Sequence, residues 1–566
     1  MRNPIACVSC RNAKQKCIHS GTPPCDRCKS TGRTNNCSFP PPGTSALHRV
    51  AKRQHDDSTS PSAELDLRKQ FPGEANGRAK RARPVSLALA DPFDLLTDQV
   101  KASYLRCSYK WCFHHTPTFL ARVHEKSLEP WVTWSILGLA VRFSKDAPLG
   151  FATCTEASVA FASQARQRLH HELEEPSVCR IQALLMLTGH DWGAGNGRRA
   201  WMHLGTAIRM VQVLNLCEEL PASANRIPSE DEFIAAEERR RTAWTCFLMD
   251  SLLSGGKGRK RSLMLEDMHI QLPCQKDKYV FGEAVRCERL DRTLAPGFSV
   301  VPIDTIGIIG HSLRAADIWG EVARWACSGT ANKFYPWDPN SRFQQLAASL
   351  EAWCSYLPKR LRYSLHTLRA HNALDEGQAF CYMHCIYFMS LMFLHRAYLP
   401  VLGPGSEHQG DHLRPQWHDS PEMKRWRDGS RAQLVAVAST VCQMVDEMRM
   451  FGTGFACGLV PWIGFTVYTA VGVVLYRYNF HPEEGDSGSV RKSRAQVIRG
   501  CTFLRDMKQQ WPMAQEWFET IKRMQACYLK VRSEGGNSIP AAEERTIRSA
   551  MVDYGALQPS PVQPAD

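Results

Sequence analysis

Six cysteines near the start of the chain have the spacing of metal ligands. Their pattern is Cys7-x2-Cys10-x6-Cys17-x7-Cys25-x2-Cys28-x8-Cys37. A C-x2-C step lets two thiolates bind one ion, because a tight turn brings both sulfurs to the same side. The pattern contains two such steps, and each is followed by one further cysteine. This arrangement indicates thiolate coordination of zinc.

The number of thiolates limits the number of ions. One tetrahedral zinc uses four thiolates and would leave two reactive cysteines idle, whereas two zinc ions need eight ligand positions. Six cysteines fill eight positions only if two of them bridge, so we expect two Zn²⁺ ions. The charge of such a cluster, −2, can be offset by the neighbouring residues Arg11, Lys14, Lys16, Arg27, Lys29 and Arg33. A unit of about 30 residues with few large apolar side chains needs the roughly 10–16 kcal/mol that structural zinc binding supplies.

Basic residues are concentrated at the same end of the chain. Residues 1–84 contain 16 Lys and Arg against 6 Asp and Glu, which accounts for +10 of the formal net charge of +14. Lys and Arg that neutralise phosphates release condensed counterions, so this distribution favours a nucleic-acid partner. A solvated basic tail has the same composition. No leader segment precedes the cysteines, so reduced thiols are expected there.

The rest of the chain separates into three stretches. Residues 41–90 are rich in Pro, Ser and charged residues and predict a flexible basic linker, whose cluster Arg78–Pro84 is typical of a nuclear import signal or an additional phosphate contact. Residues 91–533 have helical apolar periodicity with little strand-type alternation, and residues 534–566 predict a flexible tail. The predicted fold class is therefore mainly α, with a small cysteine domain at 1–40, a disordered linker and a large all-helical domain.

Several helices can be placed from the apolar spacing. Trp201, Leu204, Ile208 and Val211 share one helical face, and the acidic run Ser229–Glu232 begins another helix. Further helices are predicted near 129–144, 152–173, 305–328, 375–399 and 429–450.

Two less regular stretches lie in the second half of the chain. Residues 402–428 contain three prolines and predict a long exposed loop. Phe455–Tyr476 contains no charged residue and has about the length of a bilayer core. Gly458, Pro461 and Gly464 interrupt it, so we expect a buried helix and no membrane partner.

The cysteine spacing resembles that of the fungal Zn₂Cys₆ binuclear cluster transcription factors. The resemblance implies that Cys7 and Cys25 bridge the two ions. It also implies two further ligands for each ion, Cys10 and Cys17 on one and Cys28 and Cys37 on the other. The segment Arg11–Lys16 would then be a short helix that enters the major groove of double-stranded DNA and reads a CGG-type triplet.

The same resemblance assigns the DNA contacts. Lys14, three residues before Cys17, matches the base-reading position, and a Lys ammonium can donate to guanine O6 and N7. In the family the preceding residue is often basic, whereas here it is Ala13. The expected phosphate contacts are Arg11, Lys16, Arg27 and Lys29.

The helical region resembles the fungal-specific transcription factor domain. The segments that carry this resemblance are Gly197–Met210, Glu238–Asp250, Gly258-Arg259, Leu272-Pro273 and Pro461–Phe465, with Lys260 where the family commonly has proline. The resemblance implies a regulatory domain, action in the nucleus, and contacts with the transcription machinery or co-regulators. A homodimer is one assembly compatible with it, although no apolar heptad follows the cysteines to form a coiled coil.

An enzyme is not expected from this sequence. Pro24-Cys25-x2-Cys28 is similar to half of a zinc deaminase signature, but the upstream His-x-Glu is absent. The glycine-rich run 255–258 lacks a phosphate-binding frame and, with Arg259–Arg261, predicts a solvated basic turn. Three residues that could share a helix face are expected to be core rather than a metal site: Cys381, His384 and Cys385.

The predicted function is sequence-specific, DNA-binding regulation of RNA polymerase II transcription. The alternative function is a zinc-scaffolded protein-interaction module without base-specific DNA binding. Such modules commonly use eight ligands that include histidine, so six cysteines in a basic region favour the DNA-binding hypothesis.

Overall fold

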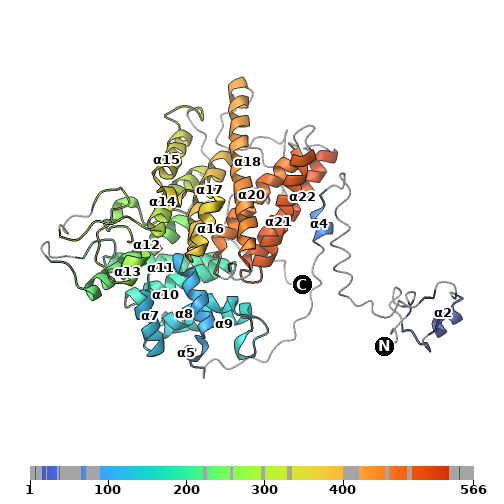
Figure 1. Cartoon of the computed structure of the whole chain (residues 1–566), viewed down its shortest axis with the longest axis horizontal. Helices are drawn as coiled ribbons and strands as arrows, with labels where there is room; N and C mark the ends of the chain where they lie inside the picture. Colours follow the sequence, from blue (N-terminus) through green and yellow to red (C-terminus); the bar gives the residue numbers. More distant parts are fainter. Residues whose placement is uncertain are drawn as a thin grey trace. The chain divides into compact units, whose positions relative to one another are not determined.

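The chain divides into two units, Met1–Leu65 and Asp66–Asp566 (Figure 1). The computed structural model describes residues 7, 10, 16–20, 22–32, 34, 37–38, 65–71, 90–220, 226–254, 259–294, 300–327, 334–398, 420–452, 455, 458–480, 487–534 and 547. The first unit contains the cysteine cluster and one described helix, α2 (Asp26–Ser30). The second unit contains the long helices.

The second unit is built from α-helices. In chain order they are α4 (Leu67–Gln70), α5 (Pro92–Leu95), α6 (Asp98–Arg106), α7 (Thr116–His124), α8 (Pro130–Ala140), α9 (Cys154–His170), α10 (Val178–Gly193), α11 (Gly197–Val213), α12 (Glu230–Leu253), α13 (Lys276–Val280), α14 (Ile308–Cys327), α15 (Arg342–Tyr356), α16 (Leu365–Ala373), α17 (Gly377–Arg396), α18 (Pro421–Met450), α20 (Pro461–Phe480), α21 (Ser487–Met507) and α22 (Met513–Glu534). Short 3₁₀ helices lie between them: η3 (Cys107–Tyr109), η4 (Val141–Phe143), η5 (Pro148–Gly150), η6 (Leu265–Asp267) and η7 (Lys359–Leu361). The described residues form no strand beyond three isolated bridges, Cys274↔Ile306, Arg286↔Ile303 and Glu288↔Leu294. The prediction of a mainly α fold is confirmed.

Most predicted helices are present with shifted ends. Helices α8, α9, α11, α12, α14 and α17 lie where the apolar periodicity placed them. The capping box of α12 explains its start, because the Ser229 hydroxyl accepts from the Glu232 N–H while the Glu232 carboxylate accepts from the Ser229 N–H.

The predicted start of α18 is wrong. This helix begins at Pro421, eight residues before the expected 429, because the Ser420 hydroxyl accepts from the Met423 N–H at 3.1 Å and caps it. Pro421 occupies the first helical position, where its missing N–H breaks no helix hydrogen bond. The expected loop therefore ends by 420, and its residues 402–419 lie outside the described residues.

Helix α10 lies at the centre of the first half of the helical unit, in contact with α8, α9, α11, α12 and α22. Two glycines one turn apart let tryptophan rings approach its backbone closely. A Cβ atom at Gly189 would lie 2.2 Å from the Trp111 ring, and one at Gly193 would lie 2.1 Å from the Trp511 ring. The Trp511 indole N–H donates to the Leu459 carbonyl at 2.8 Å. The contacts of Trp511 join α10 to the C-terminal half of the helical unit.

The C-terminal half is a bundle of neighbouring helices, in which α17, α18, α20, α21 and α22 contact one another around α20 (Figure 1). Residues 461–475 of α20 are buried, which confirms the prediction of a buried helix there. Among the described residues α17 alone is long and apolar enough to cross a membrane, but 83% of its apolar window is buried inside the protein. Core helices pass the same test, so this is weak evidence for a membrane span.

A short helix lies inside the region predicted as linker. The Phe71 ring, directly after α4, meets the Phe518 ring of α22 edge to face, with centroids 5.4 Å apart. The Arg505 guanidinium of α21 lies 5.6 Å from the Phe71 centroid, and Leu67 is fully buried. Leu67 and Phe71 are four residues apart and share one helical face. Residues 66–71 therefore belong to the helical unit.

Candidate metal centre and nucleic-acid interface

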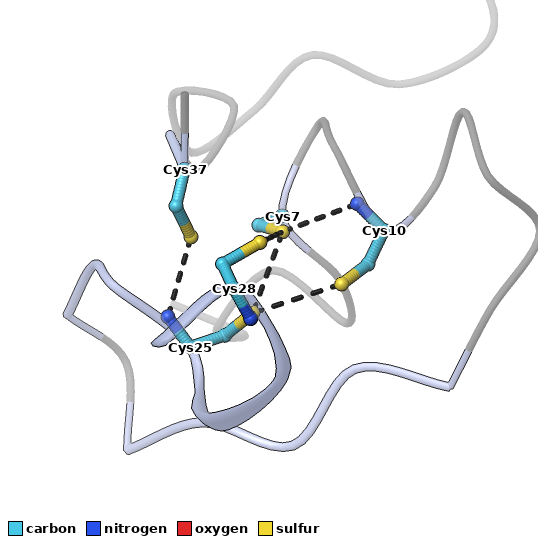
Figure 2. Close-up of a cluster of buried hydrophobic side chains, with 5 residues drawn as sticks. All are labelled: Cys7, Cys10, Cys25, Cys28 and Cys37. Atoms are coloured by element: carbon cyan, nitrogen blue, oxygen red, sulfur yellow. Dashed lines mark hydrogen bonds between the residues drawn. The ribbon is translucent and has the colours of Figure 1, made fainter. Parts of the chain in front are cut away.

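Four cysteine sulfurs meet in the buried interior of the first unit. The sulfurs of Cys7, Cys10, Cys25 and Cys28 all lie within 4.8 Å of one another, and the described cysteines are free thiols (Figure 2). The sulfur of Cys25 is 3.7 Å from that of Cys7 and 3.6 Å from that of Cys10, and Cys7 is 3.9 Å from Cys28. Two sulfurs bound to one tetrahedral zinc at ~2.3 Å are ~3.8 Å apart. The spacing of the sulfurs fits shared zinc ions.

The two C-x2-C steps have the same hydrogen bond between their cysteines. The Cys10 N–H donates to the Cys7 sulfur at 3.3 Å, and the Cys28 N–H donates to the Cys25 sulfur at 3.5 Å. In the second step the turn continues into α2, with Cys25 as its N-cap. The two halves of the motif are therefore structurally equivalent at these four residues.

The third cysteine of each half also has an equivalent position. The Cys7 N–H donates to the Cys17 sulfur at 3.4 Å, and the Cys25 N–H donates to the Cys37 sulfur at 3.2 Å. Cys17 packs against the buried cluster and Cys37 is part of it. The structure thus brings together all six predicted ligands.

Backbone hydrogen bonds help to lower the pKa of the thiols of Cys7 and Cys25. The N–H of Cys28 is the largest influence on Cys25 and lowers the pKa of its thiol to about 6. Burial acts to raise the pKa of Cys7, but hydrogen bonds from the Cys10 N–H and from neighbouring thiols outweigh it and lower the pKa. Burial raises the pKa of Cys10 and of Cys17.

Cys37 behaves differently from Cys25 despite its equivalent hydrogen bond. The Cys25 N–H acts to lower the pKa of the Cys37 thiol, but burial and the neighbouring thiols outweigh it and raise the pKa to about 12. Cys7 and Cys25 thus share a lowered pKa, in contrast to Cys10, Cys17 and Cys37.

Three of the five predicted DNA-contacting residues are described, and all three are exposed. Lys16 precedes Cys17, and Arg27 and Lys29 lie on α2. Arg11 and Lys14, together with the predicted helix that contains them, lie outside the described residues. Helix α2 itself was not predicted, although Asp26 directly after the Cys25 cap suits the first turn of a helix.

The segments that resemble the regulatory domain form buried ion pairs. Asp191 of α10 is fully buried, and its carboxylate lies 3.0 Å from Arg199 and 3.2 Å from His203, both on α11, and 3.1 Å from Arg166. Burial alone would raise the pKa of Asp191, but hydrogen bonds from His190 and His203 and the charge of Arg166 hold it well below its usual range. This network joins α9, α10 and α11.

A second buried network holds α12. The Glu237 carboxylate is fully buried and lies 2.8 Å from the Arg241 Nε and 3.3 Å from an Arg240 Nη. It also accepts from the Cys274 N–H at 3.0 Å, while Arg241 donates to the Cys274 carbonyl at 2.8 Å. Arg240 and Arg241 therefore stabilise α12 and its contact with the segment around Cys274.

The prediction of a solvated basic turn is wrong for both of its arginines, which are buried. Arg259 is 5% exposed and Arg261 is 9% exposed. Arg261 donates to the Asp317 carboxylate at 2.7 Å, and Arg259 donates to the Leu253 carbonyl at 3.0 Å. Lys260 between them is exposed. The glycines 255–258 lie outside the described residues.

The expected core position of Cys381, His384 and Cys385 is confirmed, because all three are buried in α17. The His384 Nε2–H donates to the Leu361 carbonyl at 2.9 Å. Burial lowers the pKa of His384 to about 4, so this ring is neutral.

Comparison with known proteins shows what the helical region is similar to. The fungal specific transcription factor domain matches residues 102–355, which span α6 to α15. An uncharacterized transcriptional regulatory protein of Schizosaccharomyces pombe is 26% identical over 81% of this chain and 68% of its own length. A second such protein of that yeast is 30% identical over 50% of this chain and 30% of its own length. The Zn(2)-C6 fungal-type transcription factor FTF1c of Fusarium oxysporum f. sp. lycopersici is 24% identical over 78% of this chain and 46% of its own length.

The fold and the cluster define a protein with an N-terminal unit of clustered cysteines and a large helical unit. Residues 102–355 are similar to the fungal specific transcription factor domain, and the predicted resemblance to the Zn₂Cys₆ transcription factors is confirmed. The chain spans less than half of the second and third relatives named above.

Proposed function

We propose that this protein is a sequence-specific DNA-binding transcription regulator that acts in the nucleus. The observation that carries the proposal is the set of free cysteines whose sulfurs gather at zinc-like separations in a basic unit of the chain. The names of the relatives, which are transcriptional regulators and a Zn(2)-C6 factor, support the same conclusion.

The metal centre holds two Zn²⁺ ions that share the thiolates of Cys7 and Cys25. The 3.7 Å separation of their sulfurs and the matching N–H to sulfur hydrogen bonds of the two C-x2-C steps support this assignment. Bound zinc would supply the stability that so small a unit lacks. The remaining ligands are Cys10, Cys17, Cys28 and Cys37.

The DNA interface is the basic surface around this centre. Lys14 donates to guanine O6 and N7 in the major groove of a CGG-type triplet, because these two acceptors face that groove. The exposure of Lys16, Arg27 and Lys29 supports phosphate contacts, which set orientation and add affinity that falls with salt. Arg11 completes the set of phosphate contacts.

The helical unit regulates the DNA-binding unit through the transcription machinery or co-regulators, with a homodimer as one mode of assembly. A zinc-scaffolded protein-interaction module remains the competing function.

Selection of oligonucleotides from a random pool by the full-length, zinc-loaded chain tests the proposal. We expect enrichment of CGG-type triplets, with zinc at two equivalents per chain by elemental analysis. The same protein after zinc removal by a chelator is the matched control and should enrich nothing. Zinc-loaded protein that enriches no sequence would contradict the proposal and favour the interaction module.

A further inference from the structure

A pocket of about 340 Å³ lies beside the first half of α12. Its walls come from the N-terminal half of α12, the segment between α11 and α12, and the segment that follows α13. Its volume is at the lower end of the range for small-molecule sites. Most of its lining is apolar and includes Leu220, Phe233, Ala236, Val285 and Val301.

Two of the three arginines that line the pocket already have carboxylate partners. Arg226 forms a bidentate pair with Glu232, at 2.9 and 2.7 Å. Arg240 lies 3.0 Å from Glu219 and 3.3 Å from Glu237. Each of these two arginines is therefore neutralised by a carboxylate. Glu232, the carboxylate of the pocket lining, is already paired with Arg226.

The third arginine of the lining, Arg286, has no such partner. Its guanidinium makes no ion pair or hydrogen bond with the side chains in the described part of the chain, and its Nε is buried. Its backbone is held in place, because the Asp304 N–H donates to the Arg286 carbonyl at 3.0 Å. The segments 221–225 and 295–299, which adjoin lining residues in the sequence, contain no acidic residue. Among the described residues, Arg286 is therefore the arginine of this lining without a carboxylate partner.

Several apolar side chains in and next to the lining are exposed to solvent. Ile227 is 54% exposed and Ile303, which forms the isolated bridge with Arg286, is 59% exposed. Leu220 and Val300 are each exposed by more than 40%. An apolar group that entered beside these side chains would remove them from water.

We propose that this pocket binds a small organic acid with one carboxylate and an apolar body. The carboxylate pairs with the Arg286 guanidinium, whose planar fork matches two carboxylate oxygens. The apolar body lies against Phe233 and Val285. Binding at this site does not depend on the DNA-binding function proposed above. It provides the helical unit with a site for a chemical signal.

Titration of the full-length, zinc-loaded chain with octanoate and with octanamide tests the proposal. Isothermal calorimetry measures the affinity, and a tryptophan-fluorescence melt measures the stabilisation of the fold. We expect octanoate to bind at least tenfold more tightly than octanamide, because only the acid forms a charge-assisted pair. Equal affinities, or no binding of octanoate up to 10 mM, would contradict the proposal.

Three variants locate the site. Arg286→Leu should weaken octanoate binding at least tenfold, and Ala236→Leu should weaken it by filling the pocket from α12. Arg209→Leu, on an exposed position of α11 outside the pocket, is the matched control and should bind as the unmodified chain does. Unchanged binding in Arg286→Leu or in Ala236→Leu would overturn the assignment. If Arg286→Leu does not fold, the Ala236→Leu result decides.

Discussion

At the scale of single residues, the sulfurs of Cys7 and Cys25 share one hydrogen-bond pattern. Each accepts a backbone N–H from the cysteine three positions further on, and each has a lowered pKa. A thiolate shared by two ions is a ligand of both, whereas a terminal thiolate is a ligand of one. Substitution of a shared ligand should therefore change the zinc content more than substitution of a terminal ligand.

Replacement of a shared ligand should release both metals. We expect Cys25→Ser to lose nearly all zinc, because both ions lose a thiolate, and Cys37→Ser to retain about one equivalent. Elemental analysis after gel filtration measures the content. Cys442→Ser, at a buried cysteine of α18, is the control and should keep two equivalents. A full equivalent of zinc retained by Cys25→Ser would count against bridging.

Lys14 should carry sequence information rather than affinity. Lys14→Ala is expected to reduce discrimination between the preferred triplet and its single-base variants by about 1–3 kcal/mol. Lys29→Ala, at an exposed position of α2, should instead weaken binding to all sequences and lower the salt dependence by one phosphate contact. Fluorescence anisotropy at several salt concentrations measures both. Equal losses for Lys14→Ala on specific and random DNA would refute the assignment.

At the scale of elements, α10 depends on two glycines because aromatic rings occupy the space of their missing side chains. Gly193→Ala places a Cβ 2.1 Å from the Trp511 ring, which is fully buried. Overpacking of this kind costs about 1–3 kcal/mol, and we expect that loss in the free energy of unfolding by urea. Gly205→Ala on α11 is the matched control, because its Cβ meets nothing within 4 Å. It should be neutral or stabilise by up to about 1 kcal/mol.

The packing of α4 against α21 and α22 can be tested by proteolysis. Phe71→Ala removes the ring that contacts Phe518 and Arg505, so α4 should open more often. Trypsin should then cut at Arg68 and Lys69 several-fold faster, as mass spectrometry of the fragments would reveal. Phe281→Ala, at a ring that is 69% exposed, provides the control. Cleavage at an unchanged rate would mean that the contact contributes no protection.

At the scale of the whole molecule, buried histidines should make the helical unit sensitive to acid. Burial lowers the pKa of His190, His311, His384 and His395 to about 4. Between about pH 4 and pH 6.5 the unfolded chain binds more protons than the folded chain at these sites, so the free energy of unfolding falls as pH drops through this window. His371 has a raised pKa through its pair with Glu376 and acts in the opposite sense.

Tryptophan fluorescence can follow this loss without interference from the zinc unit. All 15 tryptophans lie after residue 65, and the first is Trp111. We expect urea midpoints to fall between pH 6.5 and pH 4, with a smaller fall in His384→Phe. The contribution of one histidine is at most about 1.4 kcal/mol per pH unit. Identical pH profiles for the two proteins would show that His384 is not neutral in the folded state.

The sequence by itself determined the candidate metal ligands and most of the long helices. A C-x2-C step and a helical apolar stripe are local properties, since each depends on residues within a few positions of one another. That is why six cysteines and the helices α8, α9, α11, α12, α14 and α17 could be placed without a structure. The DNA contacts came from resemblance and stay predictions.

Only the tertiary structure decided which charged and small residues are buried, and against what. Arg261 meets Asp317, Gly193 meets Trp511 and Phe71 meets Phe518 across long stretches of sequence. In the same way, it is visible only in the folded chain that the buried Nε of Arg286 has no partner among the described residues. Pairings between distant residues depend on how whole helices pack, and no local spacing encodes them.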